Sequence, residues 1–245
     1  MELLNRVKNT GISRARPHLN SQGSLQLRQR VDQFIDRQIE NWYATVPGAR
    51  LLEQKEVNKD YYKRHLIETA WRIRLLRVVE SKAIAEIAKV SPEAAQAWAR
   101  YEMEEMLHDE MFLGDLRSLG TSLSSALQTE PYLSTKLLAG YFSYLMDHEG
   151  ALGVVAYSYL VEYVNVKLDP SKVASLAQSI GGEHVAGYAL HTKTDEVEDH
   201  PGEVWAALRY LINSPQDEAN LYRYIEEHQR ILAMYFSEIY NEFGK

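Results

Sequence analysis

The sequence predicts an all-helical fold, and three observations support this prediction. Long stretches carry apolar residues at the 3.6-residue period of a helix, and none shows the strict alternation of a strand. The 13 glycines and 7 prolines lie mostly between these stretches, as they do in the connections of a helical bundle. Ser91-Pro92 and Ser214-Pro215 each place a capping hydroxyl before a proline, which is a typical helix start.

The same signals divide the chain in order. Residues 1–22 are expected to form an N-terminal polar arm, and residues 23–245 a single helical domain. Asp169-Pro170 repeats the cap-and-proline pattern, so one helix should end near residue 167 and another should begin at 171. The expected helices cover residues 24–45, 58–89, 92–118, 133–148, 150–167, 171–180, 183–199, 203–213 and 215–242.

Composition excludes several classes of function. A net charge of −7 argues against a general affinity for nucleic acid, which requires clustered lysine and arginine. The chain contains no cysteine, so disulfides, thiolate-held metals and a cysteine nucleophile are excluded, and a metal would need nitrogen and oxygen ligands. Without an apolar leader or membrane span, we expect a cytoplasmic protein. The acidic surface and the long final helix are compatible with a homodimer.

Glu162 is the residue least explained by an ordinary core. The stretch 150–166 is apolar nearly all round, and Glu162 is its only charge. A helix without a polar face is normally buried, and a buried carboxylate is costly unless it is paired, protonated or bound to a cation. A hydrogen bond from a tyrosine or arginine of a neighbouring helix is the ordinary alternative.

A second pair of polar residues interrupts an apolar face in the expected helix 92–118. Steps of three and four residues place Trp98, Tyr101, Glu105, His108 and Phe112 on one stripe. Glu-x-x-His is the spacing by which di-iron carboxylate bundles present an oxygen and a nitrogen to one ion. The charged run 102–110 leaves a solvated helix face as the alternative.

Two further segments carry candidate ligands. In the expected helix 183–199, His191, Asp195 and Glu198 share one face with His184, where hydrated ion pairs are the alternative. In the expected helix 58–89, Glu68 lies on a stripe with aromatic residues. Arg64 and Arg72 flank that stripe, so Glu68 has local partners, and it is the weaker candidate.

The order of these residues resembles the haem-oxygenase-like dimetal oxidases, a group that includes CADD-like and pyrroloquinoline-quinone-synthase-like proteins. The likeness covers roughly residues 61–212 and implies a haem-oxygenase-like helical bundle. Carried over residue by residue, it implies the metal ligands Glu68, Glu105, His108, Glu162, His191 and Asp195. The pattern expects a histidine three residues after the aspartate, where this chain has Glu198. Either Glu198 replaces that ligand, or a distortion before Pro201 brings in His200.

The resemblance implies two iron ions, with manganese as the alternative, bridged by a carboxylate such as Glu162. Their substrates would be dioxygen and a small organic molecule. Two other readings stay open: a metal-independent enzyme of the same fold that uses histidine and carboxylates for acid–base chemistry, and a helical binding protein without catalysis. A true haem oxygenase fits poorly, because His18 follows Pro17 in a polar arm and does not suit a proximal ligand.

Overall fold

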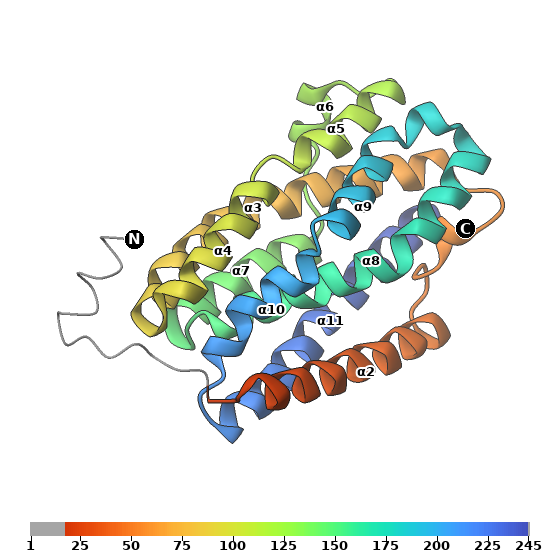
Figure 1. Ribbon diagram of the computed structural model, residues 1–245. Helices are drawn as coiled ribbons and strands as arrows, with labels where there is room; N and C mark the ends of the chain where they lie inside the picture. The colour runs from red at the N-terminus through yellow and green to blue at the C-terminus, as the bar shows by residue number, and fades with distance from the viewer. Residues whose placement is uncertain (1–17, 245) are drawn as a thin grey trace.

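The computed structural model describes residues 18–244, and over this range the protein is built from helices without strands (Figure 1). The expected arm therefore lies mostly outside the described residues, and residues 21 and 22 already belong to the first helix. The helices, with two short 3₁₀ turns, are α2 (Ser21–Thr45), η1 (Leu51–Glu53), α3 (Lys59–Val90), α4 (Pro92–Glu105), α5 (Asp109–Ser118), α6 (Leu123–Gln128), α7 (Leu133–His148), α8 (Leu152–Ile180), η2 (Gly182–His184), α9 (Ala186–Val197), α10 (His200–Leu211) and α11 (Pro215–Phe243).

The predicted caps are confirmed at two helix starts. The Ser91 hydroxyl accepts a hydrogen bond from the Ala94 amide at 3.1 Å, and the Ser214 hydroxyl accepts one from the Asp217 amide at 3.2 Å. In each case the following proline occupies the first turn, where a helix needs no amide donor. None of the helices between residues 18 and 244 is long and apolar enough to cross a membrane.

The predicted boundary at Asp169-Pro170 is wrong, because α8 runs through Pro170. Pro170 removes one hydrogen bond of the helix interior, a loss that costs about 3 kcal/mol in an isolated helix. Beyond the proline, Leu176 and Ile180 continue the apolar face and are buried in the core. The burial of these side chains therefore offsets the cost of the hydrogen bond that Pro170 removes. The Asp169-Pro170 signal does not include this packing, so it predicts a boundary that the structure does not have.

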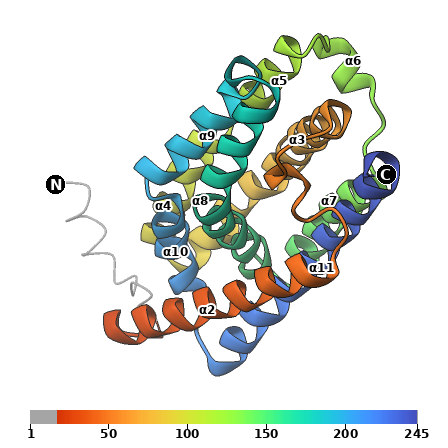
Figure 2. The ribbon, with the colours of Figure 1, turned by 90° about the vertical axis from the view of Figure 1, so that its right-hand side faces the viewer.

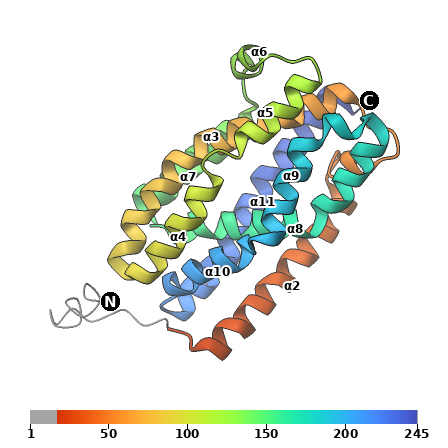
Figure 3. The ribbon, with the colours of Figure 1, turned by 45° about the horizontal axis from the view of Figure 1, so that its top comes forward.

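The predicted helix 92–118 is also divided, since it breaks into α4 and α5 at residues 106–108. A second break separates α9 from α10, and α10 packs against α4 while α9 packs against α5. The two interrupted pairs run side by side in Figures 1 and 3. α6 and the 3₁₀ turns were not expected from the sequence, because each is too short to show a period.

Two apolar clusters form the core. The larger includes Trp98 and Tyr101 of α4 together with residues of α2, α3, α7, α8, α10 and α11. The smaller includes Phe112 of α5 and Tyr188 of α9. α2 crosses one side of the bundle beside α8 and α11 (Figures 1 and 2). The polar side chains described next lie where the two clusters meet, between Tyr101 and Phe112.

Candidate metal centre

Glu105 and His108 are brought together by the break between α4 and α5. The His108 amide donates to the Glu105 carbonyl at 3.2 Å, and the Met111 amide donates to the His108 carbonyl at 3.1 Å. Such i to i+3 bonds tighten the turn to three residues, so side chains three apart nearly eclipse each other. His108 Nδ1 consequently lies 2.8 Å from Glu105 Oε2. The predicted pair faces inward, although a turn rather than a continuous helix aligns it.

Glu162 reaches the same point from α8. Its side chain is 3% exposed, and Oε1 accepts a hydrogen bond of 2.8 Å from the Tyr101 hydroxyl. Its other oxygen, Oε2, lies 3.5 Å from His200 Nδ1. Burial, followed by the charge of Glu105, raises the pKa of Glu162 to about 7. Burial thus opposes ionisation of this carboxyl group, and a nearby cation would favour it.

α9 contributes His191 and Asp195, one turn apart. His191 Nδ1 lies 3.0 Å from Asp195 Oδ2, and the Asp195 side chain is fully buried. Burial opposes ionisation of both groups, but their mutual attraction and that of nearby charges outweigh it. The pKa of His191 is therefore raised to about 9, and the pKa of Asp195 is lowered to about 2.

His200 completes the cluster from the first position of α10. The preceding Asp199 adopts a left-handed conformation, with φ of 53°, which aspartate tolerates better than most residues. Asp199 Oδ1 also accepts a hydrogen bond from the Gly202 amide at 3.2 Å and so caps α10. This reversal turns the fully buried His200 side chain inward, where Nδ1 lies 3.1 Å from Glu105 Oε1 and 3.3 Å from Asp195 Oδ1.

These six side chains form two overlapping groups. One contains Glu105, His108 and His191; the other contains Glu105, Glu162, Asp195 and His200. Within each group, one donor atom from every residue lies within 4.8 Å of all the others, which is close enough to hold one metal ion. Glu105, rather than the expected Glu162, is common to both groups.

Many donor atoms of the cluster are buried without a hydrogen bond to any described residue. They are Glu105 Oε1, Glu162 Oε2, both carboxylate oxygens of Asp195, Nδ1 of His108 and His191, and both ring nitrogens of His200. Their contacts of 2.8 to 3.5 Å are therefore not aligned as N–H···O bonds. Buried polar atoms rarely lack partners in folded proteins. Buried donor atoms that converge without aligned hydrogen bonds are the arrangement that metal ligands require, and a bound metal would displace the protons of the imidazoles.

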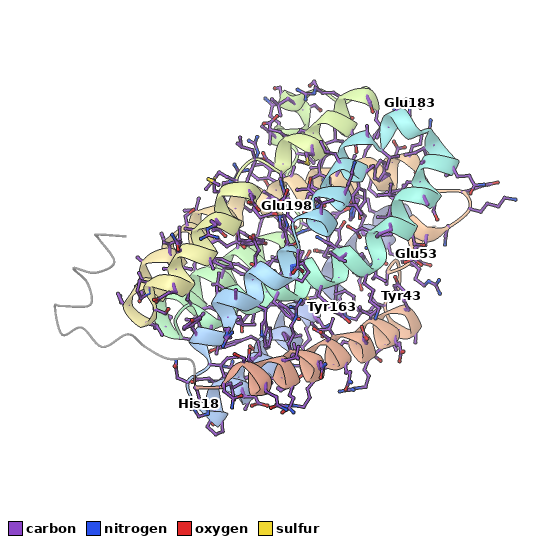
Figure 4. All side chains as sticks on the ribbon, viewed as in Figure 1. His18, Tyr43, Glu53, Tyr163, Glu183 and Glu198 are labelled. Carbon is purple, nitrogen blue, oxygen red and sulfur yellow. The ribbon has the colours of Figure 1, made fainter. Side chains whose placement is uncertain are left out.

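Two of the candidate residues lie outside the cluster. Glu68 is fully buried elsewhere, where it pairs with Arg64 at 2.7 Å and accepts hydrogen bonds from the Tyr132 amide at 3.0 Å and the Thr135 hydroxyl. Glu198 is exposed at the junction of α9 and α10 (Figure 4). Of the two alternatives left open by the sequence, the structure places His200 inward.

Sequence reasoning missed three carboxylates near the cluster: Glu102 and Glu104 of α4, and Glu80 of α3. Glu80 accepts a hydrogen bond from the Ser158 hydroxyl at 3.3 Å, and burial together with Glu105 and Glu162 raises its pKa to about 8. A signal existed in the sequence, because Glu80 interrupts a stripe that Leu76 and Ala83 continue as buried residues.

A cavity of about 180 Å³ adjoins the cluster. Glu80, Glu105, Glu162 and His191 lie along one part of its wall. Aromatic side chains cover much of the remainder, namely Trp42, Tyr101, Phe112, Tyr157, Tyr188, Tyr235 and Phe236. A concave site with convergent polar groups and aromatic walls is the usual form of a small-molecule site.

Comparison with known proteins finds solved structures that are similar to this chain in fold. No family model matches the sequence, and no curated protein matches it. A domain of unknown function with a heme oxygenase-like fold, from Shewanella denitrificans, is similar with a TM-score of 0.75 and 18% identity, over 87% of this chain and 92% of that chain. A TenA homologue from Pseudomonas syringae pv. tomato is similar with a TM-score of 0.66 and 13% identity, over 94% and 99%.

At these identities the likeness establishes the fold and leaves the activity to the chemistry of the site. The expected fold class is thereby confirmed. The protein is an all-α chain with a haem-oxygenase-like fold.

Proposed function

We propose that the protein is a non-haem dimetal oxidase or oxygenase that uses dioxygen to oxidise a small organic substrate. Iron is the proposed metal at both positions, with manganese as the alternative. One observation carries this proposal: buried carboxylate and imidazole atoms converge around Glu105 without hydrogen bonds to one another. Metal ions satisfy such atoms directly, whereas an empty polar cluster leaves them at a cost of about 1–3 kcal/mol each.

The two oxygens of Glu105 suggest how the ions would share this residue. Oε2 faces His108, and Oε1 faces His200. One ion would therefore be held by Glu105, His108 and His191, and the second by Glu105, Glu162, Asp195 and His200. Glu80 lies near enough to Glu105 and Glu162 that burial and their negative charges raise its pKa to about 8, so a bound cation would favour its ionised form.

The donor set favours iron or manganese. Carboxylate oxygens combined with imidazole nitrogens suit these metals, whereas thiolates, which zinc and copper(I) sites often use, are missing from the whole sequence. When bound, a pair of ferrous ions supplies the electrons for reduction of dioxygen, a reaction that carboxylates and imidazoles do not perform. The protein's own groups orient the ligands, as Tyr101 orients Glu162, and exclude water with the aromatic wall.

Metal analysis tests the proposal directly. Protein produced with added iron should contain about two iron atoms per chain, and its reduced form should consume dioxygen. Glu162→Ala and His108→Ala should each lose iron, because each removes a ligand from one group. Glu198→Ala is the matched control, since it removes a carboxylate close in sequence to Asp195 whose side chain is exposed. Unchanged iron content in both ligand variants would overturn the proposal.

One observation favours a second candidate, a metal-independent acid–base enzyme. The charges of His191 and Asp195 are complementary, and each shifts the pKa of the other toward its ionised form, so the cluster can neutralise part of its own charge. A protein that stays free of iron, consumes no dioxygen and loses no stability when treated with a chelator would support this alternative.

A further inference from the structure

The cavity beside the metal centre has two chemically different ends. Four carboxylates, from Glu80, Glu102, Glu105 and Glu162, lie on its wall at the centre. Farther along α3, toward its N-terminus, the wall carries His65 and Arg72, and the ion-paired Lys172 and Asp169 of α8 also line the cavity. A molecule that fills the cavity therefore meets the metal ligands at one end and basic side chains at the other.

Arg72 differs from the other cationic side chains on this wall in its partners. Arg77 pairs with Asp109 at 2.6 Å, and Lys172 pairs with Asp169 at 2.8 Å. Arg72 donates to the Thr69 hydroxyl at 2.9 Å and lies over the Tyr235 ring at 4.3 Å. Among the side chains that the structure describes, Arg72 forms no ion pair with a carboxylate, and its Nη1 is buried without a hydrogen bond.

The lack of an ion-pair partner matters for Arg72 because its side chain is a guanidinium. Arginine stays protonated inside proteins, so Arg72 cannot avoid an uncompensated charge by losing a proton. The neighbouring His65 does respond in this way: burial, followed by the charges of Arg72 and Lys172, lowers its pKa well below the usual value. His65 therefore stays neutral and contacts the Tyr235 hydroxyl through Nδ1 at 2.7 Å. The positive charge at this end of the cavity remains on Arg72.

We propose that Arg72 anchors the carboxylate of a small acid whose opposite, apolar end lies beside the metal centre. That this acid is the substrate rests on the proposed oxidase function, whereas its binding to Arg72 does not. A carboxylate accepts two parallel hydrogen bonds from a guanidinium, which fixes direction as well as position. The aromatic side chains of Tyr157, Tyr188 and Tyr235 line the space between the two ends.

The size of the cavity limits the acid. A volume of about 180 Å³ is slightly larger than the roughly 150 Å³ engineered cavity that takes up benzene, so one ring with a short side arm would fill it. Arg72 and Glu80 are separated by slightly more than two turns of α3, about 12 Å along its axis. After about 3 Å for the hydrogen bond to the carboxylate, this length suits a phenylpropanoate-sized acid.

Direct binding tests the anchor without relying on catalysis. The full chain, with and without metal, would be titrated with benzoate, phenylacetate and 3-phenylpropanoate, and with the corresponding neutral amides. We expect at least one acid to bind about 10- to 100-fold more tightly than its amide, because a charge-assisted hydrogen bond is lost in the amide. Arg72→Gln should remove this preference and Arg72→Lys should retain part of it. Arg37→Gln, at an exposed position of α2, should leave it unchanged.

The orientation of the bound acid provides a second measurement. In protein loaded with Mn²⁺, the paramagnetic ion should broaden the ring protons farthest from the carboxylate more than the protons next to it. The reverse gradient would show that the carboxylate binds the metal, and it would overturn the proposal. Equal affinity for acids and amides, no binding of any acid, or a preference that survives Arg72→Gln would overturn it as well.

These outcomes separate the two proposals. If the protein binds neither iron nor manganese but still prefers acids in a manner that depends on Arg72, the oxidase proposal fails and the anchor stands. If iron binds and dioxygen is consumed while acids and amides bind equally, the anchor fails and the oxidase proposal stands.

Discussion

Glu68 and Glu162 are both buried carboxylates on helices, and the difference between their surroundings shows what distinguishes a site from a core. Glu68 contacts a guanidinium, a backbone amide and a hydroxyl, so both of its oxygens are used. Glu162 has one tyrosine hydroxyl, while its second oxygen faces His200 without a hydrogen bond. Burial is common to both residues. Unsatisfied donor atoms that converge are found at only one of them.

Glu68→Ala should produce the largest loss of stability. Removing one partner of a buried ion pair leaves the other charge uncompensated, which typically costs about 3–5 kcal/mol. Arg64 would be the stranded group, since its side chain is 11% exposed. Urea denaturation of metal-free protein measures the effect. Iron bound per folded chain should stay unchanged, and a loss of iron in this variant would contradict the distinction drawn between the two carboxylates.

Metal binding should stabilise the native protein by a somewhat smaller amount. An ion present at 100 times its dissociation constant adds about 2.7 kcal/mol to the free energy of unfolding. Thermal denaturation with and without Fe²⁺ under anaerobic conditions, or with Mn²⁺, would detect this as an increase in Tm. Glu162→Ala should show a much smaller increase, whereas Glu198→Ala should match the unmodified chain. An equal increase in all three would indicate nonspecific binding.

Two buried histidines, His228 in the core and His191 in the cluster, should contribute to stability with opposite pH dependences. His228 lies among aromatic side chains and donates through Nδ1 to the Tyr224 carbonyl at 2.7 Å, and burial lowers its pKa to about 3. Its neutral form therefore contributes stability that is complete above the unfolded pKa near 6.5. As the pH falls from 6.5 toward 3, the free energy of unfolding should decrease by about 1.4 kcal/mol per pH unit.

His191 behaves in the opposite way, because its pKa is raised to about 9. In metal-free protein its contribution is complete below pH 6.5 and is lost as the pH rises through 9. Nitrogen NMR of the imidazoles should show His228 neutral at pH 5 and His191 charged at pH 8. Identical titration of the two rings would contradict the contrast between a core histidine and a cluster histidine.

Tyr101→Phe should have the smallest effect. It removes one hydrogen bond to Glu162 but leaves the ring packed against Trp98. A hydrogen bond to a carboxylate contributes about 1.5–3 kcal/mol, so the affinity of the second ion should fall by about 10- to 100-fold. Competition with a chelator measures this. A complete loss of that ion would mean that Tyr101 does more than orient Glu162.

Local patterns predicted the fold class and most of the inward-facing residues. Glu162 stood out because one charge in an apolar helix is conspicuous, and Glu105 with His108 stood out because of their spacing. The backbone turns that bring these side chains together could not be predicted from local patterns. The turn at residues 106–108 and the left-handed conformation of Asp199 depend on tertiary packing, so no local pattern predicts them. The orientation of the His200 side chain depends on the conformation of Asp199 and could not be predicted either.

The opposite error occurred where local rules were strongest. Pro170 carries a clear signal for a helix boundary, yet the packing of the following residues keeps α8 intact. Glu80 was missed because charged neighbours hide its place on a buried stripe. The sequence indicates both Arg64 and Arg72 as partners of Glu68. Glu68 pairs with Arg64, whereas Arg72 lines the cavity.

The spread of the six donors along the chain has a consequence for the order of assembly. Glu105 is synthesised long before His200. The group with His191 requires α9, and the group with Asp195 and His200 requires both α9 and α10. If the proposed ions bind, an emerging chain has no formed site for them, and we expect loading to follow folding. Purified metal-free protein should then accept iron or manganese without being unfolded first, and the ion that is available when folding ends would be the one bound.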